Sequence, residues 1–117
     1  MHELAIANSI VETVQQEVER QHLPPVEKIV VRLGALSDIV PEALLFNYEI
    51  ITRDTSFAKT QLEIEVVPLE GKCGDCGQNF PVEDYIFSCP ECNSGNIEVI
   101  RGEELDIAYI EVEDAEH

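Results

Sequence analysis

The chain has 117 residues, enough for one modest core or for one domain with a small appendage. It carries 24 Asp and Glu against 7 Lys and Arg, so the formal net charge is −17. This acidity argues against binding nucleic acid through phosphate neutralisation and against attachment to an anionic membrane surface. Because 44% of the residues are hydrophobic, we expect a folded protein rather than a disordered acidic tail.

The sequence shows no run of about 18 apolar residues and no basic N-terminal region followed by an apolar stretch. We therefore expect neither a membrane-spanning helix nor a secretory signal, and we expect the protein to be cytoplasmic. Structural disulfides are rare in the reducing cytosol. The four cysteines of the chain are then free, catalytic or bound to a metal.

The N-terminal third predicts a helix followed by a strand. Apolar residues recur at steps of three and four over residues 3–21, which predicts an amphipathic helix with a stripe formed by Leu4, Ala7, Val11, Val14 and Val18. Pro24 and Pro25 end this pattern. Residues 26–34 then predict a strand with Ile29, Val31 and Leu33 on one face.

The middle of the chain predicts a second helix and a second strand. Pro41 suits the first turn of a helix, and residues 42–53 continue it. Its predicted buried stripe contains Leu44, Leu45, Tyr48 and Ile51, with Phe46 and Ile50 beside it. Residues 62–67 alternate between aliphatic and polar side chains, which predicts a strand with Leu62, Ile64 and Val66 inward. Further strands are predicted at 97–100 and 105–112.

The composition changes at Gly71. From there to Gly95 lie four Cys, four Gly and two Pro in 25 residues, with few aliphatic positions. We expect that this stretch cannot build an apolar core of its own and needs a metal to hold it together. The sequence therefore predicts an α/β body, made of residues 1–70 together with 96–117, and a small inserted module at 71–95.

The cysteines form two C-x2-C pairs separated by 12 residues: Cys73, Cys76, Cys89 and Cys92. Each pair can form a tight turn that points two sulfurs at one ion. Gly74 and Gly77 supply a permissive backbone for the first turn, and Pro90 rigidifies the second. The spacing favours a tetrahedral four-sulfur site of the kind that binds structural zinc.

Two other uses of these cysteines stay open. They are two redox-active C-x-x-C pairs, or a rubredoxin-like iron site with the same four ligands. A redox C-x-x-C normally opens a helix after a strand, and neither pair precedes a helical pattern. A zinc ion with four protein ligands leaves no position for water or substrate, so we expect a structural ion. Four thiolates and one Zn²⁺ would move the formal charge from −17 to −19.

The first three residues, Met1, His2 and Glu3, offer a second metal chemistry. A free amine on Met1, the deprotonated amide of His2 and the His2 imidazole can form two fused chelate rings. Such nitrogen ligands favour a square-planar ion, Ni(II) or Cu(II), and suit tetrahedral zinc poorly. Glu3 can complete the plane through its amide or its carboxylate. The competing interpretation is an N-terminus with no ligand role.

The sequence lacks the motifs of the common enzyme classes. It has no phosphate-binding G-x-x-x-x-G-K loop, no dinucleotide-binding G-x-G-x-x-G turn and no G-x-S-x-G context for its serines. His22, at the end of the first predicted helix, and His117 have no partner at metal-ligand spacing. We therefore expect a protein that is not an enzyme.

Several segments together resemble the HypA/HybF family of nickel metallochaperones for [NiFe]-hydrogenase maturation. They are the Met1-His2-Glu3-Leu4 start, residues 33–37 followed by Val40-Pro41-Glu42, the paired cysteine motifs, and residues 102–107 before Ile110-Glu111-Val112. The resemblance covers the whole chain in order. It implies an α+β fold in which two helices pack on a three-stranded mixed sheet, with an inserted zinc-ribbon-like four-cysteine module.

The resemblance also implies the ligands, the cargo and the partners. Met1, His2 and Glu3 match the family's nickel motif, and the four cysteines match its zinc ligands. Family members deliver Ni(II) to the hydrogenase large subunit with a GTPase partner, HypB, and some serve urease through its accessory proteins. Some archaeal members use a further His near the zinc domain, but this chain has no His between His22 and His117.

Three other classes compete with the nickel chaperone. A plain zinc-ribbon interaction module would make Met1 and His2 incidental. A zinc-ribbon nucleic-acid binder is disfavoured by the charge of −17. A redox protein would hold iron in the four-cysteine site and would be coloured.

Overall fold

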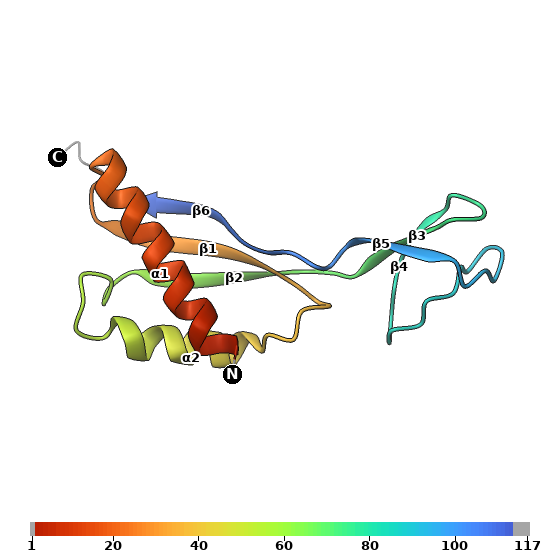
Figure 1. The fold of residues 1–117 in the computed structure, drawn as a ribbon, viewed down its shortest axis with the longest axis horizontal. Coiled ribbons are helices and arrows are strands. Elements are labelled where there is room, and N and C mark those ends of the chain that lie inside the picture. Colours follow the sequence, from red (N-terminus) through yellow and green to blue (C-terminus); the bar gives the residue numbers. More distant parts are fainter. Residues whose placement is uncertain (1, 114–117) are drawn as a thin grey trace. The chain divides into compact units, whose positions relative to one another are not determined.

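The structure, a computed structural model, describes residues 2–113, and of His2 it describes the backbone only. The elements in chain order are α1 (His2–Gln21), β1 (Val26–Gly34), α2 (Pro41–Thr52), β2 (Gln61–Val67), β3 (Glu70–Cys73), β4 (Asn79–Pro81), β5 (Ile97–Arg101) and β6 (Leu105–Val112) (Figure 1). They form two compact units. The described part of the first unit is 2–31, 38–65 and 106–113, and the second unit is 32–37 and 66–105.

The first unit is built on a mixed three-stranded sheet of order β2-β1-β6. The hydroxyl of Thr60, just before β2, donates to the carbonyl of Val26 at the start of β1. These two strands begin side by side and are parallel, with α2 as their crossover connection. At the same end, the N–H of Glu113, just past β6, donates to the carbonyl of Pro25 over 2.8 Å, so β6 runs antiparallel to β1.

Both helices contribute to the core of the first unit. In Figure 1, α1 lies across the strands of the sheet, and α2 packs beside α1. The buried core residues come from both helices, from β1 and from the segment before β2: Ala7, Ile10, Val14, Val26, Ile29, Val31, Leu44, Tyr48 and Phe57. The predicted α+β fold is therefore confirmed, with two helices on a mixed three-stranded sheet.

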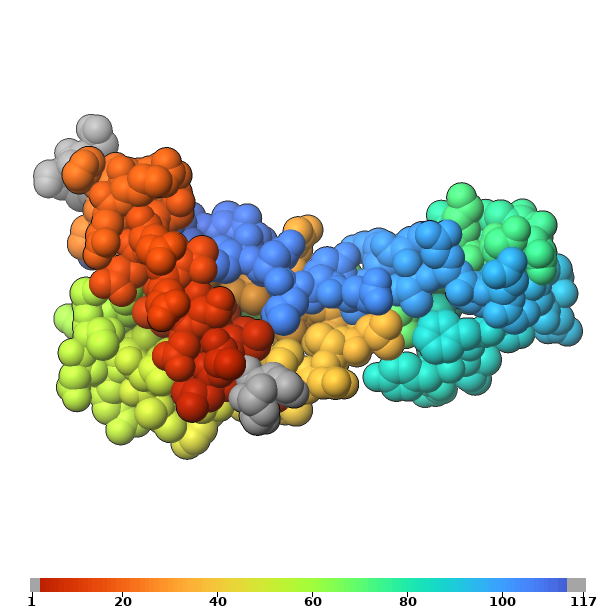
Figure 2. All heavy atoms as spheres, viewed as in Figure 1, coloured from red at the N-terminus to blue at the C-terminus, as the bar shows by residue number. Residues whose placement is uncertain are grey.

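The predicted helices and long strands match the observed ones closely, but four side chains were placed wrongly. Leu4, Phe46, Ile50 and Val66 were expected on or beside the buried faces, and all four are exposed. The buried stripes of α1 and α2 are therefore narrower than the sequence suggests, and Figure 2 shows that both helices leave a broad surface uncovered. At the end of β2 the chain buries Val67 in place of Val66.

The second unit holds an antiparallel sheet of order β4-β3-β5. The sequence did not predict β3 or β4. The sequence also did not predict the small apolar core of this unit: Leu69, Cys73, Phe80, Val82 and Cys89, with Leu36, Ile97 and Val99 packed against it. Four of these residues, Leu36, Leu69, Ile97 and Val99, lie outside the cysteine-rich stretch and supply aliphatic surface that the stretch lacks, which agrees with the expectation that residues 71–95 have no apolar core of their own.

Two glycines of the second unit approach each other closely. A Cβ placed on Gly34 would lie 2.0 Å from the carbonyl oxygen of Gly102. Gly102 has a φ of 115°, and a Cβ there would lie 2.7 Å from the Cα of Leu69. The backbone N–H of Leu36 donates to the Gly102 carbonyl over 2.8 Å, so the close approach is also a hydrogen-bonded one. Neither position has room for a Cβ atom, so both require glycine.

Candidate metal centre

The second unit brings the sulfurs of all four cysteines together. The ligand atoms of Cys73, Cys76, Cys89 and Cys92 all lie within 4.8 Å of one another. The Cys73 and Cys92 sulfurs are 3.6 Å apart, and so are the Cys76 and Cys89 sulfurs. These distances exceed the S–S bond length of about 2.0 Å, and the four thiols are not joined as disulfides.

The two C-x2-C turns have the same backbone geometry. In the first, Cys73 donates its N–H to the carbonyl of Gln78 and accepts from the N–H of Gly77, both over 2.9 Å. In the second, Cys89 has the same two bonds, to the carbonyl of Ser94 and from the N–H of Asn93, also over 2.9 Å. The fourth residue after the first cysteine has positive φ in both turns, 79° at Gly77 and 64° at Asn93.

Asn93 therefore does in the second turn what Gly77 does in the first. The sequence pattern pointed to Gly77 and not to Asn93, although Asn tolerates the left-handed region better than most residues. Gly74, expected to supply conformational freedom, has a different role: a Cβ there would lie 2.5 Å from the side-chain nitrogen of Asn96. Its small size is what the fold requires.

Backbone N–H groups point at the sulfurs. Asp75 and Cys76 donate to the Cys73 sulfur, each over 3.4 Å, and Glu91 donates to the Cys89 sulfur over 3.4 Å. The first cysteine of each pair, Cys73 and Cys89, is buried, and the second is exposed. Such N–H···S bonds stabilise a thiolate, the form that binds a metal.

The proton affinities of the sulfurs differ in a way that suits a shared cation. The N–H of Cys76 is the main cause that lowers the pKa of the Cys73 thiol to about 6. At Cys92 the N–H of Ser94 favours the thiolate, but the nearby Cys73 sulfur, burial and the other two thiols together raise its pKa to about 12. Four sulfurs this close cannot all be anionic unless a cation lies among them.

The geometry fits a tetrahedral four-sulfur metal site. A zinc ion with Zn–S bonds of about 2.3 Å places its sulfurs about 3.8 Å apart. The two sulfur pairs at 3.6 Å and the overall limit of 4.8 Å agree with that spacing. The donor set of four thiolates also suits zinc and iron rather than hard cations.

A polar contact links the two turns beside the sulfurs. The Ser94 hydroxyl donates to the carboxylate of Asp75 and accepts from the N–H of Asn96 over 3.0 Å. Asp75 lies inside the first C-x2-C pair, and Ser94 follows the second. No sequence motif marks these two residues, because their pairing depends on the register of two turns, and the residues themselves are 19 positions apart in the chain.

The predicted N-terminal site lies largely outside the described residues. Met1 and the His2 side chain belong to that part of the chain. The carboxylate of Glu3 is described, and it accepts a hydrogen bond from the backbone N–H of Val40 over 3.1 Å. This bond is the main reason that the pKa of Glu3 is lowered. Of the three predicted ligands, Glu3 thus has a defined place at the start of α2.

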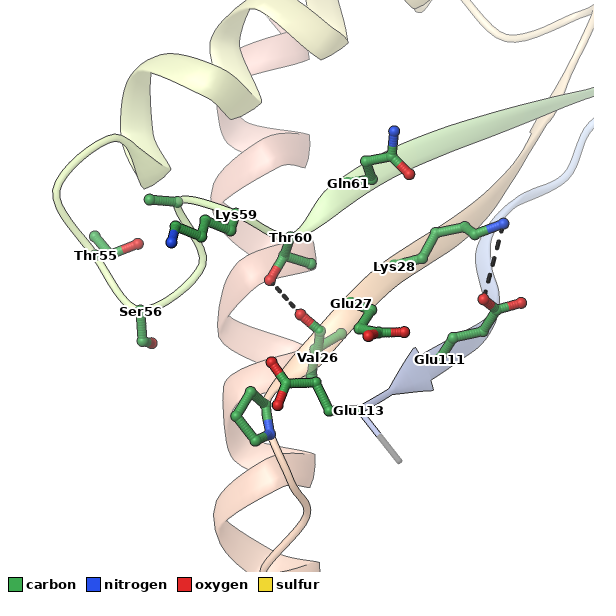
Figure 3. Close-up of a pocket in the computed structure, with 12 residues that line it drawn as sticks. Val26, Glu27, Lys28, Thr55, Ser56, Lys59, Thr60, Gln61, Glu111 and Glu113 are labelled. Atoms are coloured by element: carbon green, nitrogen blue, oxygen red, sulfur yellow. Dashed lines mark hydrogen bonds and ion pairs between the residues drawn. The ribbon is translucent and has the colours of Figure 1, made fainter. Parts of the chain in front are cut away.

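The first unit also has a surface cavity of about 630 Å³, at the end of the sheet where β1 and β2 begin (Figure 3). Its lining mixes charges. Lys28 lies 3.8 Å from a carboxylate oxygen of Glu111, and the Thr60 hydroxyl is bonded to the Val26 carbonyl. Figure 3 shows these two pairs within the lining. Among the described residues that line it, we find no arrangement of nucleophile, base and anion-binding group.

A protein-family model described as hydrogenase/urease nickel incorporation, metallochaperone, HypA matches residues 1–112. The chain belongs to the HypA family. Curated relatives of this HypA-family chain include the hydrogenase maturation factor HypA of Acidithiobacillus ferrooxidans, 36% identical, and that of Geobacter metallireducens, 39% identical. Each alignment spans 113 residues, which is 97% of this chain and the full length of the relative.

Solved structures support the fold. The solution structure of the Ni metallochaperone HypA from Helicobacter pylori matches 94% of this chain and 96% of its own, with a TM-score of 0.64 and 22% identity. A second solution structure of a HypA protein matches with a TM-score of 0.72 over 96% of both chains, at 21% identity. In the described part of this HypA-family chain, neither helix is long and apolar enough to cross a membrane.

Proposed function

We propose that this chain is a cytoplasmic nickel chaperone that delivers Ni(II) to the large subunit of a [NiFe]-hydrogenase during its maturation. The observation that carries the proposal is the match of the nickel-incorporation family over residues 1–112, which includes Met1, His2 and Glu3. The protein would act by binding and release rather than by catalysis. A HypB-type GTPase is its proposed partner in the transfer.

In the proposed nickel site, nitrogen atoms supply the plane. The ligands are the Met1 amine, the amide and the imidazole of His2, and an atom of Glu3. The first N–H groups of an α-helix have no carbonyl partner within the helix, so deprotonating the amides at the start of α1 breaks no helical hydrogen bond. The carboxylate of Glu3 is engaged by Val40, which supports the Glu3 amide as the fourth ligand.

We further propose that Cys73, Cys76, Cys89 and Cys92 bind zinc with a structural role. When bound, zinc supplies the positive charge that allows four close thiolates. The chain contributes the two matched turns and the N–H···S bonds that orient the sulfurs. For the division of the chain we propose a nickel-binding domain of 1–70 with 96–117 and a zinc-binding domain of 71–95; the compact second unit around the four cysteines is larger, because β5 pairs with β3 and belongs to it.

The decisive experiment is a titration of untagged, zinc-loaded protein with Ni(II), followed by the d–d absorption band of square-planar nickel. His2→Ala should abolish stoichiometric binding and leave the zinc content unchanged. His22→Ala is the matched control, because it removes a histidine at the other end of α1 and should bind nickel normally. A residue added before Met1 should act like His2→Ala, since it displaces the free amine.

Unchanged nickel affinity in His2→Ala would contradict the proposed ligand set. The pH dependence is a second check. The amine, the amide and the imidazole must lose protons before nickel binds, so affinity should fall as the pH is lowered. A pH-independent affinity would argue for other ligands.

Urease is a second proposed client, because the description of the family names hydrogenase and urease together. The curated relatives reported above are named as hydrogenase maturation factors, which favours hydrogenase as the first client. Nickel-loaded protein can be offered separately to a hydrogenase large-subunit precursor and to urease with its accessory proteins. Activation of urease at a rate no greater than that given by free Ni(II) would remove urease from the proposal.

A further inference from the structure

Three consecutive apolar side chains are exposed in a loop of the second unit. Tyr85 is 66% exposed, Ile86 is 61% exposed and Phe87 is 38% exposed. The loop runs from Glu83 to Ser88 and is anchored by Val82 and Cys89, which are both buried. Single exposed apolar residues are common on protein surfaces, but three in succession on one loop are not.

The loop is held by a strained turn. Asp84 and Tyr85 both have positive φ, 55° and 58°, and the N–H of Ile86 donates to the carbonyl of Glu83 over 3.0 Å. These are the features of a type I′ turn, which normally contains Asn-Gly or a similar pair. A tyrosine in the left-handed region costs stability that glycine would not. The fold therefore keeps the exposed Tyr85 side chain in this turn at a cost in stability.

The chain segment that carries these side chains is acidic, and its flanking basic residues are Lys72 and Arg101. Between Cys73 and Ile100 the chain has five acidic residues and no Lys or Arg: Asp75, Glu83, Asp84, Glu91 and Glu98. A four-thiolate zinc site would add two further negative charges. Two of the acidic residues, Glu83 and Asp84, belong to the turn itself.

This charge narrows the choice of partner. A second copy would bring the same acidic segment to the contact, and an anionic lipid surface would repel it. A protein surface with an apolar pocket edged by Lys and Arg is complementary in both respects. The loop is short and anchored, so its three side chains can enter such a pocket with little ordering of the chain.

We propose that Tyr85, Ile86 and Phe87 form a docking loop that inserts into an apolar pocket edged by basic residues on a partner protein. The loop belongs to the zinc-binding unit, so this contact is separate from the N-terminal nickel ligands. The four-cysteine site fixes Cys89 at one end of the loop, and β4 with Val82 fixes the other. The four-cysteine site would then fix the conformation of a loop that contacts a partner protein, without contacting the nickel ion.

The test compares two loop variants with a control. Tyr85→Gly removes the side chain and suits the positive φ, so it should leave the fold intact or stabilise it. Ile86→Ser removes a second contact. Ile100→Ser is the matched control, because Ile100 is an exposed isoleucine of the same unit. All are used as zinc-loaded full-length chains with zinc content measured.

The choice of probes rests on the proposed function: a purified hydrogenase large-subunit precursor and a purified HypB-type GTPase. Binding is measured without nickel. For at least one probe, both loop variants should bind about tenfold more weakly or worse, while Ile100→Ser binds within about twofold of wild type. A Glu83→Gln, Asp84→Asn variant should associate more slowly and show a weaker dependence on salt.

Several outcomes would overturn the docking loop. They are equal binding by wild type and both loop variants, no binding of either probe by wild type, or binding to anionic lipid vesicles that the variants lose. Self-association that Tyr85→Gly abolishes would assign the loop to a second copy instead. Nickel titration of the same proteins separates the proposals, because failed nickel binding contradicts the proposed function and leaves the loop measurement intact.

Discussion

The carboxylate of Glu3, in the first turn of α1, accepts a hydrogen bond of 3.1 Å from the backbone N–H of Val40, immediately before α2. No side chain of its own segment caps α2. Val40 is the N-cap residue, and its carbonyl accepts the first helical bond, from Leu44 over 3.0 Å. An acidic side chain at this position also favours the positive end of the α2 dipole. One carboxylate thus joins the starts of both helices.

Glu3→Gln should therefore lower the stability of the first unit at neutral pH. The amide oxygen can still accept from Val40, but the negative charge at the start of α2 is lost. Urea unfolding followed by a probe in the first unit measures the change. Glu12→Gln is the matched control, because Glu12 is an exposed residue of the same helix and should have a smaller effect.

The effect of Glu3→Gln should depend on pH in one direction. The Val40 N–H, followed by the N–H of Glu3 itself, lowers the pKa of Glu3 below its ordinary value of 4.5. The stabilisation is therefore fully present above about pH 4.5 and is lost as the pH falls through the lowered pKa. Wild type and Glu3→Gln should converge in stability in acid. A difference that persists there would show that the charge is not its source.

Gly34→Ala should destabilise the second unit. The added Cβ would lie 2.0 Å from the backbone oxygen of Gly102, so the two chain segments must move apart. Overpacking of this kind costs about 1–3 kcal/mol, and here the obstructing atom belongs to the backbone. Faster amide hydrogen exchange at Leu36, whose N–H bonds to the Gly102 carbonyl, is the specific readout.

Gly95→Ala is the matched control for this prediction. A Cβ at Gly95 meets nothing within 4 Å, and no positive φ is found there. Its effect should be within about 0.5 kcal/mol of wild type. Equal effects of the two alanines would contradict the claim that the close approach to Gly102 requires glycine.

The first unit could be predicted well from the sequence, because its elements are long and periodic. The alternation in residues 26–34 and the helical stripe in 3–21 each repeat several times, and both elements end near the expected residues. The exposure of Phe46 and Ile50 could not be predicted, because it depends on how much of α2 is covered by α1. Periodicity identifies a helix but does not measure the width of its buried face.

For the second unit the ligand set and the strand at 97–100 were predicted, but β3 and β4 were not. The spacing of Cys73, Cys76, Cys89 and Cys92 was sufficient to expect their sulfurs to meet, and they do. The strands β3 and β4 have only four and three residues and lack a hydrophobic alternation. The pairing of β3 and β4 follows from the two cysteine turns, so the hydrophobic pattern of neighbouring residues does not predict it.

Asn93 offers a test of the equivalence between the two turns. Its φ of 64° should tolerate glycine, so Asn93→Gly should change stability by less than about 1 kcal/mol. Asn93→Val should cost about 1–2 kcal/mol because a β-branched residue is strained in the left-handed region. Competition with a zinc chelator should show the same order, with release easiest from the valine variant. Equal zinc retention by the two variants would show that this backbone conformation does not support the site.

Removal of the metal should unfold the second unit and leave the first one folded. The second unit buries few aliphatic side chains, and two of its five core residues are the cysteines Cys73 and Cys89. Structural zinc contributes about 10–16 kcal/mol in zinc-finger peptides, more than a core of this size supplies. Hydrogen exchange after chelation should lose protection in β3 and β5 and retain it in β1 and α2, which act as the internal control.

The same site should lose its metal on acidification, since protons compete with zinc for the sulfurs. Cys92, whose pKa is raised to about 12 mainly through its sulfur neighbours despite the Ser94 N–H, must give up its proton when zinc binds. Zinc affinity should therefore be weaker at about pH 5.5 than at about pH 7.5, with protons released on uptake. Cys73→Ser should abolish tight binding at both pH values. A second unit that keeps its exchange protection in this variant would show that the apolar residues, not the metal, hold it together.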